Sequence, residues 1–110
     1  MKAQIRSIAQ DDITRQYRYY LVHENSPATA KRFIAQVQTT IKQVCRSPQI
    51  GQPKILKNPK LVGLRSWPVN SFPAIRIYYV VRDSGLLVIR VLHNRRDINP
   101  LLEHDVVEEL

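Results

Sequence analysis

The stretch between Ser26-Pro27 and Ser47-Pro48 is the strongest constraint on the fold. Its apolar residues recur every three or four positions: Ala30, Phe33, Ile34, Val37, Ile41, Val44 and Cys45. This spacing predicts a helix with one continuous apolar face. Ser26 is a favourable N-cap, and Pro27 suits the first helical position because an N–H there would lack an intrahelical partner. Pro48 disfavours helix at the preceding residue. The stretch therefore predicts a helix over residues 27–46 that buries one face against a second layer.

A second helix is predicted before this one. Ser7 and Gln10 have the spacing of a capping box, and Asp11 and Asp12 would then lie in the first turn, where the helix dipole favours carboxylates. The predicted buried stripe consists of Ala9, Ile13, Tyr17, Tyr20 and Leu21. The link at Asn25-Ser26 is short, so the two helices should form an antiparallel hairpin.

The rest of the chain reads as loop and strands. Residues 48–60 hold three prolines, a glycine and three lysines, which predicts a basic irregular loop. Asp83-Ser84-Gly85 is typical of a three-residue hairpin loop. Strands are expected at 3–6, 62–68, 74–82 and 86–93, and a short helix at Ile98–Glu103. The predicted fold class is α+β: a helical hairpin packed on a small, mainly antiparallel sheet of three to four strands, in one domain spanning 1–110.

Pairing across the predicted hairpin loop gives the last two strands two different faces. One face, with Ile77, Tyr79, Val81, Leu87, Ile89 and Val91, is apolar and should pack on the helices. The other face mixes arginines with apolar residues: Arg76, Tyr78, Val80, Val88, Arg90 and Leu92. Buried, unpaired arginines are too costly for a core, so this face is expected to be an open groove. A groove of this chemistry suits an acidic amphipathic segment of another protein, or RNA.

The charge of the chain points to an anionic partner. Seventeen Lys and Arg residues against nine Asp and Glu give a net charge of +8, which favours nucleic acid or an acidic protein. The alternative is that the surplus charge serves only solubility. Cys45 is the only cysteine, so no internal disulfide is expected and a reducing cytoplasm fits. The three histidines are scattered, and neither a metal site nor a cofactor is expected. No apolar run approaches the ~20 residues of a membrane span.

Polar residues cluster where the last predicted strand ends. His93 is expected to be a hydrogen-bonded structural residue, or alternatively a general base. Arg95 and Arg96 follow the strand, and at least one is a candidate contact for phosphate or carboxylate. Asp97 is expected to pair with an arginine or to cap the short helix. Arg65 either reaches the rim of the groove or is an ordinary edge-strand arginine.

Several short motifs, taken in order, resemble the ParE/RelE superfamily of bacterial toxins. They are Ala9-x-x-Asp12-Ile13, Ser26-Pro27-x-x-Ala30-x-x-Phe33, Pro48-x-x-Gly51, Gly63-Leu64-Arg65, Arg76-Ile77-Tyr78-Tyr79, and Arg90-Val91-Leu92-His93 followed by Arg95-Arg96-Asp97. The resemblance covers nearly the whole chain. It implies a toxin of a type II toxin-antitoxin system with the fold described above.

The two branches of this superfamily imply different activities. RelE-like members are similar to ribosome-dependent nucleases that cut messenger RNA with basic residues and a tyrosine, histidine or glutamate near the chain end. This chain has Asn94 after His93 and no tyrosine after Tyr79, and so looks ParE-like. The resemblance implies a toxin that inhibits DNA gyrase without chemistry of its own. The alternatives are an endoribonuclease acting on ribosome-bound message, and a non-toxic relative that only binds a partner. In the nuclease alternative the phosphate would be held by Arg65, His93, Arg95 and Arg96.

The resemblance also implies partners. A small antitoxin would hold the chain inactive in a toxin-antitoxin hetero-oligomer, with a segment filling the predicted groove. The antitoxin-binding residues would then be Arg76, Tyr78, Val80, Val88, Arg90 and Leu92. The expected target-binding residues are Arg65, Arg95 and Arg96.

Overall fold

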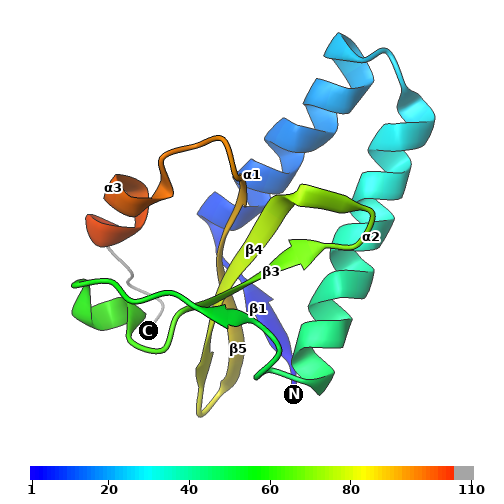
Figure 1. Ribbon diagram of the computed structural model, residues 1–110. Coiled ribbons are helices and arrows are strands. Elements are labelled where there is room, and N and C mark those ends of the chain that lie inside the picture. The colour runs from blue at the N-terminus through cyan, green and yellow to red at the C-terminus, as the bar shows by residue number, and fades with distance from the viewer. Residues whose placement is uncertain (106–110) are drawn as a thin grey trace.

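A helical hairpin and a five-stranded sheet form the main layers of the protein, shown in Figure 1 as a computed structural model that describes residues 1–105. The predicted domain 1–110 includes residues 106–110, which lie outside the described part. The helices are α1 (Ser7–Arg18), α2 (Pro27–Arg46) and α3 (Ile98–Glu103), with a π-helical turn η1 (Tyr19–His23) and a 3-10 turn η2 (Pro59–Leu61). The strands are β1 (Ala3–Ile5), β2 (Gln52–Pro53), β3 (Arg65–Val69), β4 (Phe72–Arg82) and β5 (Gly85–His93).

The strand order across the sheet is β1-β5-β4-β3-β2, and only the β1–β5 pair is parallel. The α+β class is therefore confirmed, with one strand more than expected. The additional strand, β2, lies in the segment predicted to be irregular. Gln52 pairs with Ser66, and Pro53 pairs with Arg65. Proline is tolerated there because β2 is an edge strand, where a missing N–H breaks no inner ladder.

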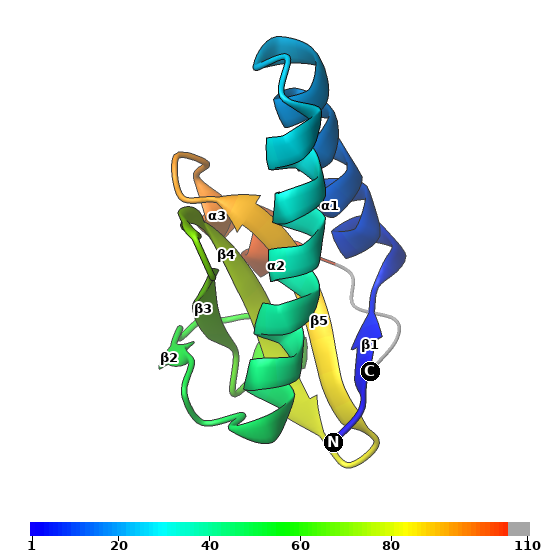
Figure 2. The ribbon, with the colours of Figure 1, turned by 90° about the vertical axis from the view of Figure 1, so that its right-hand side faces the viewer.

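The hairpin of α1 and α2 covers one face of the sheet. Figure 2 shows the two helices side by side along that face, with their connecting turn extending past the end of the sheet. The predicted start of α2 is confirmed, because the Ser26 hydroxyl accepts a hydrogen bond from the Thr29 N–H at 3.2 Å. The core beneath the helices contains Ala9, Ile13, Tyr20, Ala30, Phe33, Val37, Ile41, Val44, Val69, Phe72, Ile75, Ile77, Tyr79, Leu86, Val88 and Val91.

The start of α1 differs from the prediction. Arg6 is the N-cap residue and makes no side-chain capping bond, so Ser7 is already helical and the capping box is wrong. Asp11 and Asp12 therefore lie beyond the first turn. Asp12 is buried instead.

The face predicted to be an open groove is covered, so that prediction is wrong. Leu61 and Leu64, from the segment before β3, and Leu102 of α3 pack onto it and are almost fully buried. With them lie Tyr78, Val80, Leu87, Ile89 and Leu92, in a second apolar core. The sheet thus lies between two apolar layers rather than presenting one face to solvent.

A β-bulge explains why the two faces were partly misassigned. The predicted pairs Arg76–Leu92, Ile77–Val91 and Tyr78–Arg90 are confirmed, but the next pair joins Tyr79 to Val88. Ile89 is the extra residue, and a bulge of this kind shifts the alternation of side chains by one. Leu87 and Ile89 consequently face the second core, while Val88 faces the helices.

The bulge also shortens the hairpin loop. Arg82 pairs with Gly85, leaving two loop residues rather than three. Gly85 has a positive φ of 135°, and a Cβ there would lie 2.5 Å from the Lys2 carbonyl oxygen. This position therefore requires glycine.

Polar contacts fasten α3 to the rest of the protein. Glu103 accepts hydrogen bonds from the N–H groups of Lys57 (3.1 Å) and Asn58 (2.8 Å). The Asn58 amide donates to the carbonyls of Leu102 (2.9 Å) and Asp105 (3.1 Å). Arg6 forms a bidentate pair with the Asp105 carboxylate at 2.7 and 3.1 Å. The short predicted helix at Ile98–Glu103 is confirmed, and these bonds fix its position on the sheet.

Glu103 should make the attachment of α3 sensitive to acid. The hydrogen bond from the Lys57 N–H lowers the pKa of Glu103 below its usual value, with a further contribution from the Asn58 N–H. A folded-state pKa below the unfolded value stabilises the fold above the unfolded pKa, and that stabilisation is lost as the pH falls through the folded pKa. We expect Glu103→Gln to lower the melting temperature at pH 7 and the two proteins to converge toward pH 3. Thermal unfolding followed by circular dichroism measures this. Glu24→Gln removes the same charge from an exposed turn and is the control. A constant difference across the pH range would contradict the prediction.

Candidate functional site

A pocket of about 480 Å³ lies where the helical hairpin passes the end of β5. One wall comes from α1, η1 and the turn after them, and the other comes from the end of β5 and the residues that follow. The helical hairpin extends beyond the sheet at the end where β5 leads into α3 (Figure 2). The lining residues are Asp12, Arg15, Gln16, Tyr19, Tyr20, Glu24, Val91, Leu92, His93, Arg95 and Arg96.

A buried ion pair joins the two walls. The Asp12 carboxylate accepts hydrogen bonds from Arg90 Nε at 2.7 Å and Arg90 Nη2 at 2.8 Å. It also accepts the Val91 N–H at 3.1 Å. The side chains of Asp12 and Arg90 are 1% and 7% exposed. The hydrogen bonds that Arg90 donates to Asp12 raise the pKa of Arg90 above its usual value. This pair holds α1 against β5 and so sets the distance between the pocket walls.

The turn after β5 presents two arginines to the pocket. The Asn94 N–H donates to the Ala74 carbonyl at 2.7 Å, and the Arg96 N–H donates to the His93 carbonyl at 3.1 Å. These backbone bonds hold the turn, while the side chains of Arg95 and Arg96 are exposed. Within residues 1–105 neither guanidinium forms a hydrogen bond or an ion pair. The two groups are therefore available to an anionic ligand.

Arg15 adds a third cation from the opposite wall. Its guanidinium reaches Asp12 Oδ1 at 3.3 Å but stays 63% exposed. Since Asp12 already pairs with Arg90, Arg15 keeps most of its donors for a ligand.

The hydrogen bonding of His93 bears on catalysis. Its Nδ1 lies 3.0 Å from the backbone N–H of Arg95, which can only donate, so Nδ1 is the acceptor. The neutral ring therefore carries its proton on Nε2. This tautomer can donate a hydrogen bond to an anion, but it cannot accept a proton at Nε2. A general base would have to break the bond to Arg95 first.

The hairpin wall supplies aromatic surface. Tyr19 is 46% exposed and stacks on His23, with 5.5 Å between ring centroids. Tyr20 turns the other way and packs against Phe33 and Phe72 in the core. Burial raises the pKa of Tyr20. Both tyrosines belong to η1, and π-helical turns are often found at functional sites.

The structure divides the residues predicted to contact the target (Arg65, Arg95 and Arg96) or, with His93, to hold the phosphate in the nuclease alternative. His93, Arg95 and Arg96 line one pocket. Arg65 is not among the lining residues; it lies on β3, two strands from β5. Its guanidinium bonds to the carbonyls of Gly51 (2.7 Å) and Gln49 (3.3 Å) and to the Gln49 side chain (2.9 Å). Arg65 thus fastens the loop after α2, and it is not on an edge strand because it pairs with Pro53 of β2 and with Tyr79 of β4.

The residues predicted to bind the antitoxin are mostly inaccessible. Tyr78, Val80, Val88, Arg90 and Leu92 are each at most 6% exposed. Arg76 is partly exposed, and it bonds to Ser66 Oγ at 3.1 Å and Gln52 Oε1 at 2.8 Å. The physical reason is that Arg90 is paired with Asp12, so it can be buried. Charge reversal at Arg90 would consequently test folding rather than partner binding.

The pocket residues Arg15, Tyr19 and Glu24 were not assigned to a site from the sequence. Arg15 and Tyr19 are four residues apart on α1 and η1, which places them on one helix face. That four-residue spacing is visible in the sequence and could have indicated a shared helix face. Their position opposite Arg95 and Arg96 follows only from packing between distant parts of the chain.

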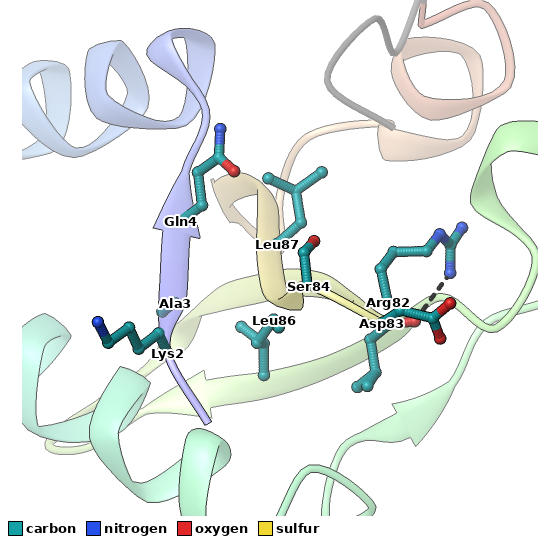
Figure 3. A pocket seen from close by; sticks show the side chains of 10 residues that line it. Lys2, Ala3, Gln4, Arg82, Asp83, Ser84, Leu86 and Leu87 are labelled. Atoms are coloured by element: carbon teal, nitrogen blue, oxygen red, sulfur yellow. Dashed lines mark hydrogen bonds between the residues drawn. The ribbon is translucent and has the colours of Figure 1, made fainter.

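A second pocket, of about 610 Å³, lies at the opposite end of β5, beside the β4–β5 loop. Figure 3 shows Gln4 and Leu87 next to each other there, with Arg82 and Asp83 at the loop. The Arg82 guanidinium is already bonded to the carbonyls of Val81 and Lys60, each at 3.0 Å. The pocket at the His93 end has the larger concentration of unpaired charge, and we take it as the candidate site.

The comparisons with known proteins agree with this structure. The family model described as "ParE toxin of type II toxin-antitoxin system, parDE" matches residues 4–98. A solved structure described as "Chromosomal ParDE TA system from P. aeruginosa" has the same fold, with a TM-score of 0.67 and 16% identity. That alignment covers 84% of this chain and 95% of the other.

The search of curated proteins finds no match. Among residues 1–105, no helix has the length and apolar character to cross a membrane. The family match spans both pocket walls and nearly all of the sheet. The chain belongs to the ParE toxin family of type II toxin-antitoxin systems.

Proposed function

We propose that this ParE-family chain inhibits DNA gyrase by binding to it, that a cognate antitoxin neutralises it in a hetero-oligomer, and that both events occur in the cytoplasm. The family match supports the toxin assignment. The observation that carries the mode of action is the state of His93, whose Nδ1 is occupied by the Arg95 N–H. The pocket therefore offers cations and ring surfaces, which suit binding, rather than a base ready to take a proton.

The test is a plasmid supercoiling and cleavage assay with the purified chain, purified gyrase and ATP. We expect supercoiling to be lost and linear DNA to accumulate as the chain is added. Arg46→Gln, at an exposed position at the far end of α2, serves as a folded control with an unchanged pocket. Normal supercoiling at large molar excess of folded protein would overturn the proposal.

A second function is favoured by one observation. His93, Arg95 and Arg96 share a pocket, as a ribosome-dependent endoribonuclease would require, although Arg65 is elsewhere. This alternative predicts codon-positioned cuts in translated messages and no effect on gyrase. A non-toxic relative would show neither effect and would not slow growth when expressed alone.

A further inference from the structure

We propose that the pocket defined by Arg15, Tyr19, Glu24, His93, Arg95 and Arg96 is a docking site for an extended acidic peptide segment of a protein partner. The inference rests on the proposed function, since it assumes that the chain acts and is neutralised through protein contacts. It goes further by naming the surface and the chemistry of the segment that fills it.

The charges in the pocket indicate which chemical group of the partner segment binds between the two walls. Arg95 and Arg96 have no partner within residues 1–105, and Arg15 is mostly exposed on the facing wall. Guanidinium groups on two sides of one cavity fit a carboxylate, which each can bind through paired hydrogen bonds. The Nε2–H of His93 supplies one more donor at the same strand end. A carboxylate side chain of the partner is therefore expected between α1 and the turn after β5.

The remaining lining argues for a peptide rather than a nucleic-acid strand. Glu24 faces the same cavity and makes no ion pair within the described residues. A phosphate backbone carries a charge at every nucleotide and would place one of them against this carboxylate. A peptide can instead present a backbone N–H or a basic side chain to Glu24. The exposed ring of Tyr19 then suits an aliphatic neighbour of the acidic residue.

The buried pair beneath the pocket makes the site a preformed one. Asp12 and Arg90 neutralise each other and fix α1 on β5, so the backbone segments that carry the three remaining arginines are held on opposite walls. Preorganised donors lower the conformational cost of binding. A single acidic residue at this point can therefore contribute strongly to affinity.

The experiment titrates the isotopically labelled chain with two short peptides and follows backbone N–H signals by NMR. One probe is acetyl-Leu-Glu-Leu-amide, and the other has glutamine in place of the glutamate. We expect saturable shifts at Tyr19 and residues 93–96 with the acidic peptide at millimolar concentration. The glutamine peptide should bind several-fold more weakly. Equal binding of the two peptides, or no binding of the acidic one, would overturn the proposal.

Variants test whether the arginines carry the interaction. Replacing Arg95 and Arg96 together by glutamine should weaken binding of the acidic peptide at least about tenfold, since it removes two charge-assisted contacts. Arg46→Gln is the matched control, because it removes an exposed arginine at the far end of α2. Loss of affinity in the control alone, or equal loss in both, would refute the pocket as the site.

A third probe separates the peptide from the phosphate alternative. Inorganic phosphate that shifts the same signals as strongly as the acidic peptide would assign the pocket to phosphate and overturn the inference. The outcome is independent of gyrase: peptide binding together with normal supercoiling would refute the proposed function and leave the docking site standing. Inhibition of gyrase without peptide binding would support the proposed function and refute the docking site.

Discussion

Asp12→Ala is expected to lower the free energy of unfolding by about 3–5 kcal/mol, because it leaves the buried guanidinium of Arg90 without its partner. Asp12 accepts both Arg90 bonds and the Val91 N–H, and its side chain is 1% exposed. The two side chains are only 1% and 7% exposed, so water can replace those bonds only in part. A domain of this size is stable by only about 5–15 kcal/mol, so the loss is a large part of the total. Denaturant unfolding followed by circular dichroism measures it.

Two further variants separate the ion pair from other effects of the substitution. Asp11→Ala removes the neighbouring exposed carboxylate from the same helix and should change stability by less than about 0.5 kcal/mol. The double variant Asp12→Ala with Arg90→Met removes both buried charges and should recover part of the loss, since a paired charge can be exchanged for an apolar group at little cost. It will not recover everything, because the Val91 N–H still lacks an acceptor. A loss below about 1 kcal/mol in Asp12→Ala would mean that water reaches the pair.

The elements that the sequence predicted well are those with local signals. The pattern over 27–46 contains its own start, face and stop, and α2 matches it from Pro27 to Arg46. The short helix at Ile98–Glu103 was likewise predicted with its bounds. Neither prediction required knowledge of a distant part of the chain.

The errors come from contacts between distant residues. Asp12 looked like a dipole-stabilising residue on the surface, and Arg90 looked too polar to be buried; the two are 78 positions apart and are buried together. A bulge at Ile89 cannot be recognised within an apolar stretch of sequence. The predicted alternation of side chains between the two sheet faces was therefore continued past it. The same limit applies to the candidate site. His93, Arg95 and Arg96 were found as a local cluster, whereas Arg15 and Glu24 join them only through packing.

The covering of the second sheet face gives the second large prediction: Leu102→Ala should loosen α3 and destabilise the protein by about 2–5 kcal/mol. Leu102 is fully buried among residues of β4, β5 and the segment before β3. A helix of six residues is not stable alone, so α3 depends on this contact and on the bonds from Lys57 and Asn58. Asn99→Ala, at an exposed position of the same helix, is the control and should have little effect.

The pattern of hydrogen exchange in Leu102→Ala distinguishes separate opening of α3 from unfolding of α3 together with the core. If α3 opens on its own, hydrogen exchange in Leu102→Ala will accelerate at residues 98–105 and at Lys57 and Asn58, while α2 keeps its protection. If the second core unfolds with the whole domain, protection will fall equally in α2 and β5. We expect the first pattern, because the bonds from Lys57 and Asn58 hold α3 to the segment before β3 and not to the central strands. Such an opening would expose Tyr78 and Leu92, the face that sequence reasoning assigned to the antitoxin. Uniform loss of protection would instead make that face a permanent interior and leave the pocket beside β5 as the surface for partners.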